Sequence, residues 1–191
     1  MDAWLSPADW LAAQRAEPEP AAPAARPVTY QGVSFRSTLE ASWACTLDGL
    51  GIEWEYEPWS YRLAGGETYV PDLWLPVLRT VIEVKGGHMQ RAAKPAQLAV
   101  EWADSGVIVL LGFAPGRTSQ SPYSWESKLK WRDALGYDTR LALCSGCQRW
   151  QWVRAQLSRG CRACPVLALT GVLAKPGEIA FQEVNRVVPR R

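Results

Sequence analysis

Residues 67–85 read ETYVPDLWLPVLRTVIEVK, and this stretch decides the fold. Its two halves, 67–75 and 79–85, are rich in β-branched and aromatic residues, a composition that is typical of β-strands. Only a short connection separates the halves, and its centre lies at Val77 and Leu78. The stretch therefore predicts two consecutive strands that pair as an antiparallel hairpin.

The register of this hairpin predicts a cluster of charged side chains. With the turn at Val77 and Leu78, paired positions sum to 155, so Asp72 lies opposite Glu83 with Cβ atoms about 5 Å apart. Residues two apart in a strand point to the same face, so Lys85 emerges beside Glu83. Opposed carboxylates repel each other unless a cation lies between them. Carboxylate oxygens suit Mg²⁺ or Mn²⁺, so the pattern predicts a divalent metal site with Lys85 next to it.

The alternative is an amphipathic strand whose charges are simply solvated. Two features argue against it. Asp72 lies inside an otherwise apolar strand, and residues 81–85 are mostly β-branched, as in a central strand. Charges in such positions need partners.

The flanking sequence predicts an α/β chain. Ser37 and Glu40 have capping-box spacing at the start of an apolar helical pattern. The unbroken apolar run before Phe113 is typical of a strand buried on both faces. The expected order is a helix from Ser37 to about Gly51, strands over 52–63, 67–75 and 79–85, a helix from Pro95 to about Asp104, a strand over 106–113, and a helix over 125–135.

Pro71-Asp72 and Glu83-Val84-Lys85, taken with this order, resemble the PD-(D/E)XK (restriction-endonuclease-like) nuclease superfamily. The likeness covers residues 30–113 and is strongest to endonucleases of phages and mobile elements. It implies an αβββαβ core with a mixed sheet. It also implies Mg²⁺- or Mn²⁺-dependent hydrolysis of DNA phosphodiester bonds.

The resemblance also implies roles for individual residues. Asp72 and Glu83 would bind the catalytic metal, with the Val84 carbonyl as a third ligand. Lys85 would assist the attacking water. Glu40, on the first helix, would bind the metal directly or through water, but its capping-box position gives the same carboxylate a structural role.

Two further residues near this cluster have competing interpretations. Arg36 can meet a DNA phosphate or form a surface ion pair. His88, the single histidine of the chain, can contact the phosphate or lie in an exposed loop.

Four of the five cysteines form a C-x2-C…C-x2-C pattern. Cys144 and Cys147 form one pair, and Cys161 and Cys164 form the other, 13 residues further on. This spacing predicts a closed tetrahedral Zn²⁺ site, with an iron–sulfur cluster or disulfides as alternatives. Such a zinc has no open position for catalysis, so its role is structural. Cys45 is expected to be a buried, inert thiol.

Charge is distributed unevenly along the chain. Residues 1–139 hold 12 Lys and Arg against 17 Asp and Glu, whereas residues 140–191 hold 9 against 2. A basic end beside an acidic body indicates contact with a polyanion such as nucleic acid, with a solvated tail as the alternative. Trp150 and Trp152 are expected either to pack the core of the zinc module or to stack on bases. The arginines expected to contact DNA, besides Arg36, are Arg149, Arg154, Arg159 and Arg162.

The expected domains are an N-terminal arm over 1–28, a nuclease core over 29–138, and a zinc module with a basic tail over 139–191. The Pro/Ala-rich stretch 17–27 cannot build a core. No apolar run approaches the roughly 20 residues that span a bilayer, and no secretory signal is evident. We therefore expect a cytoplasmic protein of a bacterium or phage-infected cell.

A second class of function fits the same residues. The chain would then be a non-catalytic, zinc-dependent DNA-binding protein, or a recruitment subunit of a transposition or recombination complex. A protein partner would bind the Trp-bearing N-terminal arm. The sequence is also compatible with a homodimer, because enzymes that cut both DNA strands commonly use two active sites.

Overall fold

The computed structural model describes residues 27–85, 93–113, 131–133, 138–144 and 146–154, together with Cys161, Cys164 and Val184. Several sequence predictions therefore lie outside the described residues: the arm over 1–26, the helix over 125–130, His88, Arg159 and Arg162.

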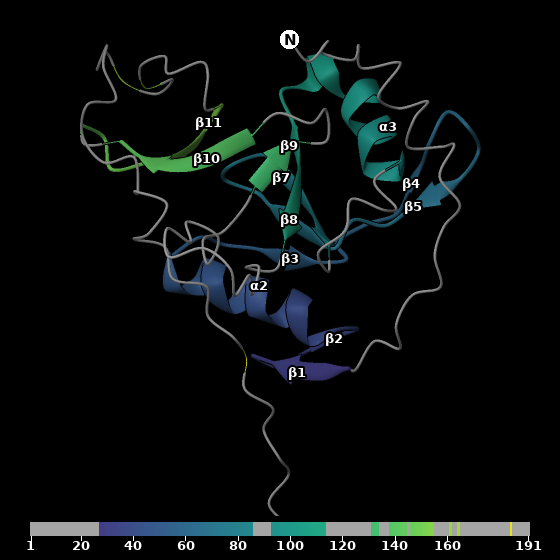
Figure 1. Cartoon of the computed structure of the whole chain (residues 1–191), viewed down its shortest axis with the longest axis horizontal. Coiled ribbons are helices and arrows are strands. Elements are labelled where there is room, and N and C mark those ends of the chain that lie inside the picture. The colour runs from purple at the N-terminus through teal and green to yellow at the C-terminus, as the bar shows by residue number, and fades with distance from the viewer. Residues whose placement is uncertain are drawn as a thin grey trace, which may run out of the picture.

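A seven-stranded mixed sheet is the centre of the fold (Figure 1). Its strand order is β11-β10-β9-β8-β7-β6-β3, and only the β7–β8 pair is parallel. The expectation of an α/β fold with a mixed sheet is confirmed. The strands are β3 Glu55–Tyr56, β6 Leu73–Leu75, β7 Thr80–Lys85, β8 Ile108–Phe113, β9 Trp131–Asp133, β10 Asp138–Leu143 and β11 Trp150–Arg154.

Two short hairpins stand outside this sheet. Strand β1 (Val28–Tyr30) pairs with β2 (Val33–Phe35), and β4 (Tyr61–Arg62) pairs with β5 (Thr68–Tyr69). The first hairpin turns on two residues with positive φ, Gln31 and Gly32, as a tight two-residue turn requires. Val28, assigned to the arm from the sequence, is thus the first residue of β1.

Helices cover both faces of the sheet (Figure 1). On one face, α2 (Thr38–Gly49) packs Trp43 and Leu47 against Ile82 and Leu110. On the other, α3 (Ala93–Glu101) packs Leu98 against the preceding residues of the same two strands, Val81 and Val109. A 3-10 turn, η1 (Ala103–Ser105), follows α3. This alternation is the pleat of a sheet buried on both faces. Among the described residues, no helix is both long and apolar enough to cross a membrane.

The start of α2 follows the sequence prediction. Ser37 is the N-cap, and its hydroxyl accepts the Glu40 N–H at 3.2 Å. The helix ends at Gly49, and Gly51 has a left-handed φ of +67°. Cys45, expected to be buried, is only half-buried on this helix.

The β6–β7 register is confirmed. Leu73 pairs with Ile82, and Leu75 pairs with Thr80, so the paired positions sum to 155. A four-residue turn over 76–79 connects the strands. The next positions outward from Leu73 and Ile82 are Asp72 and Glu83, which brings the two carboxylates to the same end of the hairpin.

Two predicted strands are shorter than expected, and both are broken beside the carboxylate cluster. The strand expected over 52–63 is interrupted after β3, where Glu57 has a left-handed φ of +45°. The strand expected over 67–75 is interrupted between β5 and β6 at Pro71, which has no N–H to donate to a ladder.

The helix expected over 125–135 is wrong for its last part, because Trp131–Asp133 forms strand β9. Here Leu111 of β8 pairs with Arg132. The backbone N–H and C=O groups along the edge of β8 need hydrogen-bond partners, and β9 supplies them. This tertiary pairing outweighs the local helical pattern of the segment.

The cysteine-bearing hairpin, β10 and β11, belongs to the central sheet. Trp152 is 7% exposed, and its Nε1–H donates to Thr80 Oγ1 at the start of β7, at 2.8 Å. Trp150 donates to the Leu50 carbonyl, at the end of α2, at 3.1 Å. Of the two expected roles for these tryptophans, core packing holds, but the core is that of α2 rather than a separate small one. The expected boundary at residue 139 falls inside β10.

Candidate active site and cysteine cluster

The carboxylate of Asp72 is nearly inaccessible and is held on both oxygens. Asp72 is 5% exposed. Its Oδ1 accepts a hydrogen bond from the Arg36 guanidinium at 2.9 Å, and its Oδ2 accepts the Val84 N–H at 2.8 Å. A backbone donor from β7 and a side-chain cation from the β2–α2 junction therefore fix this carboxylate together.

Glu83 and Lys85 form a second pair on the same strand. Lys85 Nζ lies 2.8 Å from Glu83 Oε1, and Lys85 is only 7% exposed. The other Glu83 oxygen accepts the Tyr69 hydroxyl at 2.7 Å. The prediction that Glu83 and Lys85 emerge together from β7 is thus borne out by their contact.

Glu40 reaches the same region from the first turn of α2. Its Oε2 accepts the Tyr56 hydroxyl at 2.7 Å, and the Tyr56 oxygen in turn accepts the Arg36 N–H at 3.0 Å. Ser37 caps the helix, and the Glu40 carboxylate is directed to the cluster.

The electrostatics of the cluster are those of crowded negative charge. Burial raises the pKa of Asp72 well above its ordinary value, and the neighbouring Glu83 and Glu40 carboxylates raise it further. The Val84 N–H and Arg36 act in the opposite direction without cancelling the rise. Desolvation lowers the pKa of Arg36, but Tyr56 and the surrounding carboxylates raise it above its ordinary range, so Arg36 carries its charge.

Both tyrosines stay protonated donors at neutral pH. Burial raises the pKa of Tyr56 to about 12, and the Glu40 carboxylate adds to the rise. Burial and Glu83 raise the pKa of Tyr69 well above its ordinary value. Neither residue was identified from the sequence, because their contacts depend on the breaks at Glu57 and Pro71.

The donor chemistry of Asp72, Glu83 and Glu40 suits a hard divalent cation such as Mg²⁺. The three carboxylates lie near enough for Glu83 and Glu40 to raise the pKa of Asp72. They do not yet form a closed ligand set, since among the described residues only the cysteines bring three or more ligand atoms within 4.8 Å of one another. Arg36, Lys85 and the two tyrosines occupy the carboxylate oxygens instead.

The cysteines of the two C-x2-C motifs form a group that can hold a metal ion such as zinc. The Sγ atoms of Cys144 and Cys164 are 3.6 Å apart, as are those of Cys147 and Cys161, and all four lie within 4.8 Å. Four thiolates about 2.3 Å from a zinc ion at the centre of a tetrahedron are about 3.8 Å apart. The spacing of the sulfurs fits this geometry.

The turn that carries the first two cysteines stabilises the thiolate of Cys144, whereas burial raises the pKa of Cys147. Hydrogen bonds from the Cys147 and Gly146 N–H groups, the first being the larger effect, lower the pKa of Cys144 to about 6. The Cys144 N–H donates to the Arg149 carbonyl at 3.0 Å, and Gln148 has a left-handed φ of +54°. The backbone thus curls its N–H groups toward the sulfurs.

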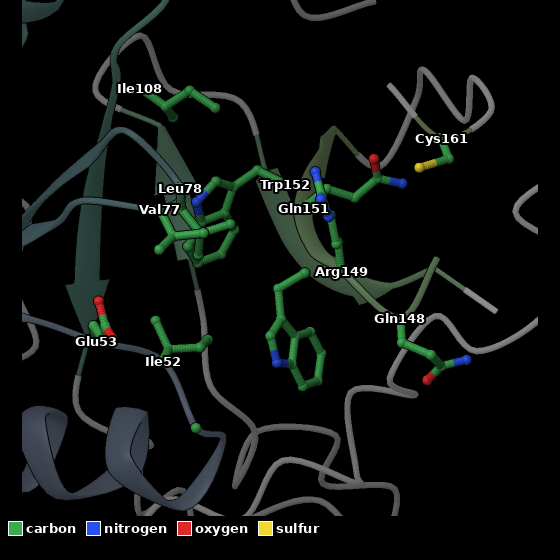
Figure 2. A pocket seen from close by; sticks show the side chains of 12 residues that line it. Ile52, Glu53, Val77, Leu78, Ile108, Gln148, Arg149, Gln151, Trp152 and Cys161 are labelled. Atoms are coloured by element: carbon green, nitrogen blue, oxygen red, sulfur yellow. The ribbon is translucent and has the colours of Figure 1, made fainter. Parts of the chain in front are cut away.

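A groove of about 670 Å³ separates this turn from the body of the protein. Figure 2 shows Val77 and Leu78 of the β6–β7 turn on one side, and Gln148 and Cys161 on the other. Val77 is 78% exposed at its rim. The groove lies at the start of β7, whereas Lys85 ends this strand. The cysteine cluster and the carboxylates therefore lie toward opposite ends of β7.

The predicted DNA-contacting arginines are therefore divided between two places. Arg36 lies at the carboxylates, and Arg149 is exposed beside the cysteine turn, at the groove. Arg154 contributes its backbone to β11. In comparisons with known proteins, no protein-family model and no curated protein matches the chain.

Proposed function

We propose that the protein is a Mg²⁺- or Mn²⁺-dependent nuclease that hydrolyses DNA phosphodiester bonds. The observation that carries the proposal is the buried Asp72 carboxylate, crowded by Glu83 and Glu40 and flanked by a buried lysine. A cluster of two buried carboxylates, Asp72 and Glu40, and the partly exposed Glu83 destabilises a fold unless cations balance their charge. Clusters that reduce the stability of a fold in this way are typical of functional sites.

The order and direction of the elements support the proposal. Helix α2, strands β3, β6 and β7 of the central sheet, helix α3 and strand β8 come in this order, with the β4–β5 hairpin between β3 and β6 and with β7 parallel to β8. Apart from that hairpin, the order resembles the αβββαβ order of PD-(D/E)XK nucleases. Asp72 directly precedes β6, and the Glu-x-Lys motif lies on the adjacent strand β7, which is the arrangement expected in that superfamily.

Each residue of the cluster has a role in this reaction. Asp72 and Glu83 would hold the cation, with the Val84 carbonyl and Glu40 completing its surroundings. A divalent cation in this position acidifies an attacking water and stabilises charge on the phosphate. Lys85, held by Glu83, would orient that water and stabilise the negative charge that develops on the phosphate. Tyr69 and Tyr56 fix the two glutamates.

The cysteine hairpin would act at a distance from the chemistry. A Cys₄ zinc has no open coordination position, so it holds the β10–β11 turn in shape. Arg149, exposed beside this turn, would contact DNA backbone away from the cut.

The test is cleavage of labelled duplex, single-stranded, forked and four-way-junction DNA with Mg²⁺ or Mn²⁺. Asp72→Asn and Lys85→Met should each reduce cleavage at least a hundredfold. Asp104→Asn and Lys94→Met are the matched controls, because both residues are solvent-accessible side chains outside the cluster. Both control variants should cut like the wild type.

Metal-dependent cutting that is lost only in the two cluster variants would support the nuclease. Tight DNA binding without cutting, unchanged by either cluster substitution, would contradict it. The second candidate function, a zinc-dependent DNA-binding or recruitment protein, would then remain, and the exposed Arg149 beside the cysteine group is the observation that favours it.

A further inference from the structure

The two oxygens of Asp72 differ in how firmly they are held. Oδ2 accepts from the Val84 N–H, a backbone group inside the β7 ladder that cannot leave without unpairing the strand. Oδ1 accepts from Arg36 Nη2, which sits at the end of a long side chain. A cation that approaches Asp72 through Oδ1 therefore competes with Arg36 for that oxygen.

The two cations of the cluster differ in the same way. The Lys85 side chain is 8% exposed and is paired with Glu83 inside the site. The Arg36 side chain is 59% exposed, so its guanidinium can move into solvent without any shift of the backbone. Of these two cations, Arg36 is the one that can be exchanged.

Arg36 also has a second anchor at the rim of the cluster. Its Nε lies 2.6 Å from Glu57 Oε1, and Glu57 is partly exposed. Glu57 adopts a left-handed φ of +45°, while its N–H donates to the Asp72 carbonyl at 3.0 Å. Such a conformation is costly for a non-glycine residue and persists where the surroundings require it. Glu57 can retain Arg36 beside the site after Nη2 leaves Asp72.

We propose that Arg36 is the resident counter-ion of Asp72 in the metal-free protein, that a divalent cation displaces it, and that the displaced guanidinium then binds the phosphate of the substrate. The exchange follows from charge, because a divalent cation that binds the Asp72 carboxylate repels a guanidinium already held on it. Arginine suits the second task, since its planar donors match phosphate oxygens. This inference rests on the proposed nuclease function and concerns the regulation of the same site.

Replacing Arg36 should have opposite effects on the affinity for the cation and on the rate of cleavage. Removing the guanidinium frees Oδ1, so the cation should bind more tightly. The same change removes a phosphate contact, so cleavage should become slower. A variant that merely disturbs the fold would weaken both, and this difference separates an exchangeable counter-ion from a structural ion pair.

The experiment measures Mn²⁺ affinity by calorimetry on full-length, zinc-supplemented protein, and cleavage rate at saturating Mn²⁺. The variants are Arg36→Met, the control Arg62→Met on the exposed face of β4, and Asp72→Asn. Arg36→Met should bind Mn²⁺ about two- to fivefold more tightly, the value of one largely exposed ion pair. It should also cut at least tenfold more slowly, whereas Arg62→Met should match the wild type in both measurements.

The outcomes separate this inference from the nuclease proposal. Unchanged or weaker Mn²⁺ binding by Arg36→Met, in a wild type that cuts DNA and needs Asp72 for Mn²⁺, would overturn the exchange and leave the nuclease intact. A wild type that neither binds Mn²⁺ nor cuts DNA would overturn both. Circular dichroism verifies folding, and Arg36→Gln, with the same expected result, replaces Arg36→Met if that variant unfolds.

Discussion

Replacing Trp152 with Phe tests whether the cysteine hairpin and the main core are one cooperative unit. The Trp152 Nε1–H bond to Thr80 Oγ1, 2.8 Å long and buried at both ends, is worth about 1 kcal/mol. Phenyl has about three fewer buried heavy atoms than indole, which removes about 2 kcal/mol more. The free energy of unfolding should fall by about 3 kcal/mol, or roughly 6–12 °C in Tm for a chain of this size.

Chemical denaturation followed by circular dichroism gives the magnitude, and hydrogen exchange gives the location. Amides of α2 and β7 should lose protection together with those of β10 and β11. The double variant with Thr80→Val should lose about 1 kcal/mol less than the sum of the single changes, because both remove the same bond. Trp150→Phe, whose ring is only half-buried, is the control and should cost about 1 kcal/mol.

Unchanged protection in α2 and β7, with loosening confined to the hairpin, would refute this reasoning. The hairpin would then be an independent module that rests against the core. A chelator offers a second route to the same question: a metal ion held by the four cysteines would, on removal, lower the stability of the whole sheet.

Three further results are expected. Folding raises the pKa of Asp72, so the stability associated with its protonated form is present at low pH and is lost as the pH rises through the folded value; Asp72→Asn should therefore stabilise the metal-free protein by about 1–2 kcal/mol near neutral pH, with a gain in thermal denaturation that shrinks as the pH falls. Tyr69→Phe removes the hydroxyl on Glu83 Oε2, so cleavage should fall roughly ten- to hundredfold while the free energy of unfolding falls by only about 1–2 kcal/mol, and equal rates for Tyr69→Phe and Tyr61→Phe would contradict a positioning role. A Cβ on Gly112 would lie 3.1 Å from Trp43 Cε2, so Gly112→Ala should destabilise by about 1–3 kcal/mol in urea denaturation, whereas an unchanged midpoint would show that Trp43 moves freely.

Local pattern was enough to predict the β6–β7 hairpin, because its register depends on one short turn and on alternation. The helix cap at Ser37 and the apolar strand β8 follow equally short-range rules. The same rules predict that Asp72, Glu83 and Lys85 lie together at one end of the hairpin. The cysteine group followed from spacing alone, since two C-x2-C turns leave few other arrangements.

What the sequence could not predict depends on contacts between distant segments. Arg36 meets Asp72 across 36 positions, and Tyr69 meets Glu83 only because the chain breaks at Pro71. The strand β9 forms because the edge of β8 is available to it. The place of Trp152 in the α2 core, 72 positions from its partner Thr80, overrides the division into domains that composition indicated.

The four-residue turn over 76–79 constrains far more than its own conformation. One inserted or deleted residue there would slip the pairing of β6 with β7 and move Asp72 away from Glu83. It would also turn the side chains of one strand to the other face, moving Ile82 from the α2 side to the α3 side and burying charge against α2. Natural selection should therefore remove changes in the length of this turn as strictly as substitutions of the carboxylates. Loop insertions in an engineered form of the protein should be placed elsewhere.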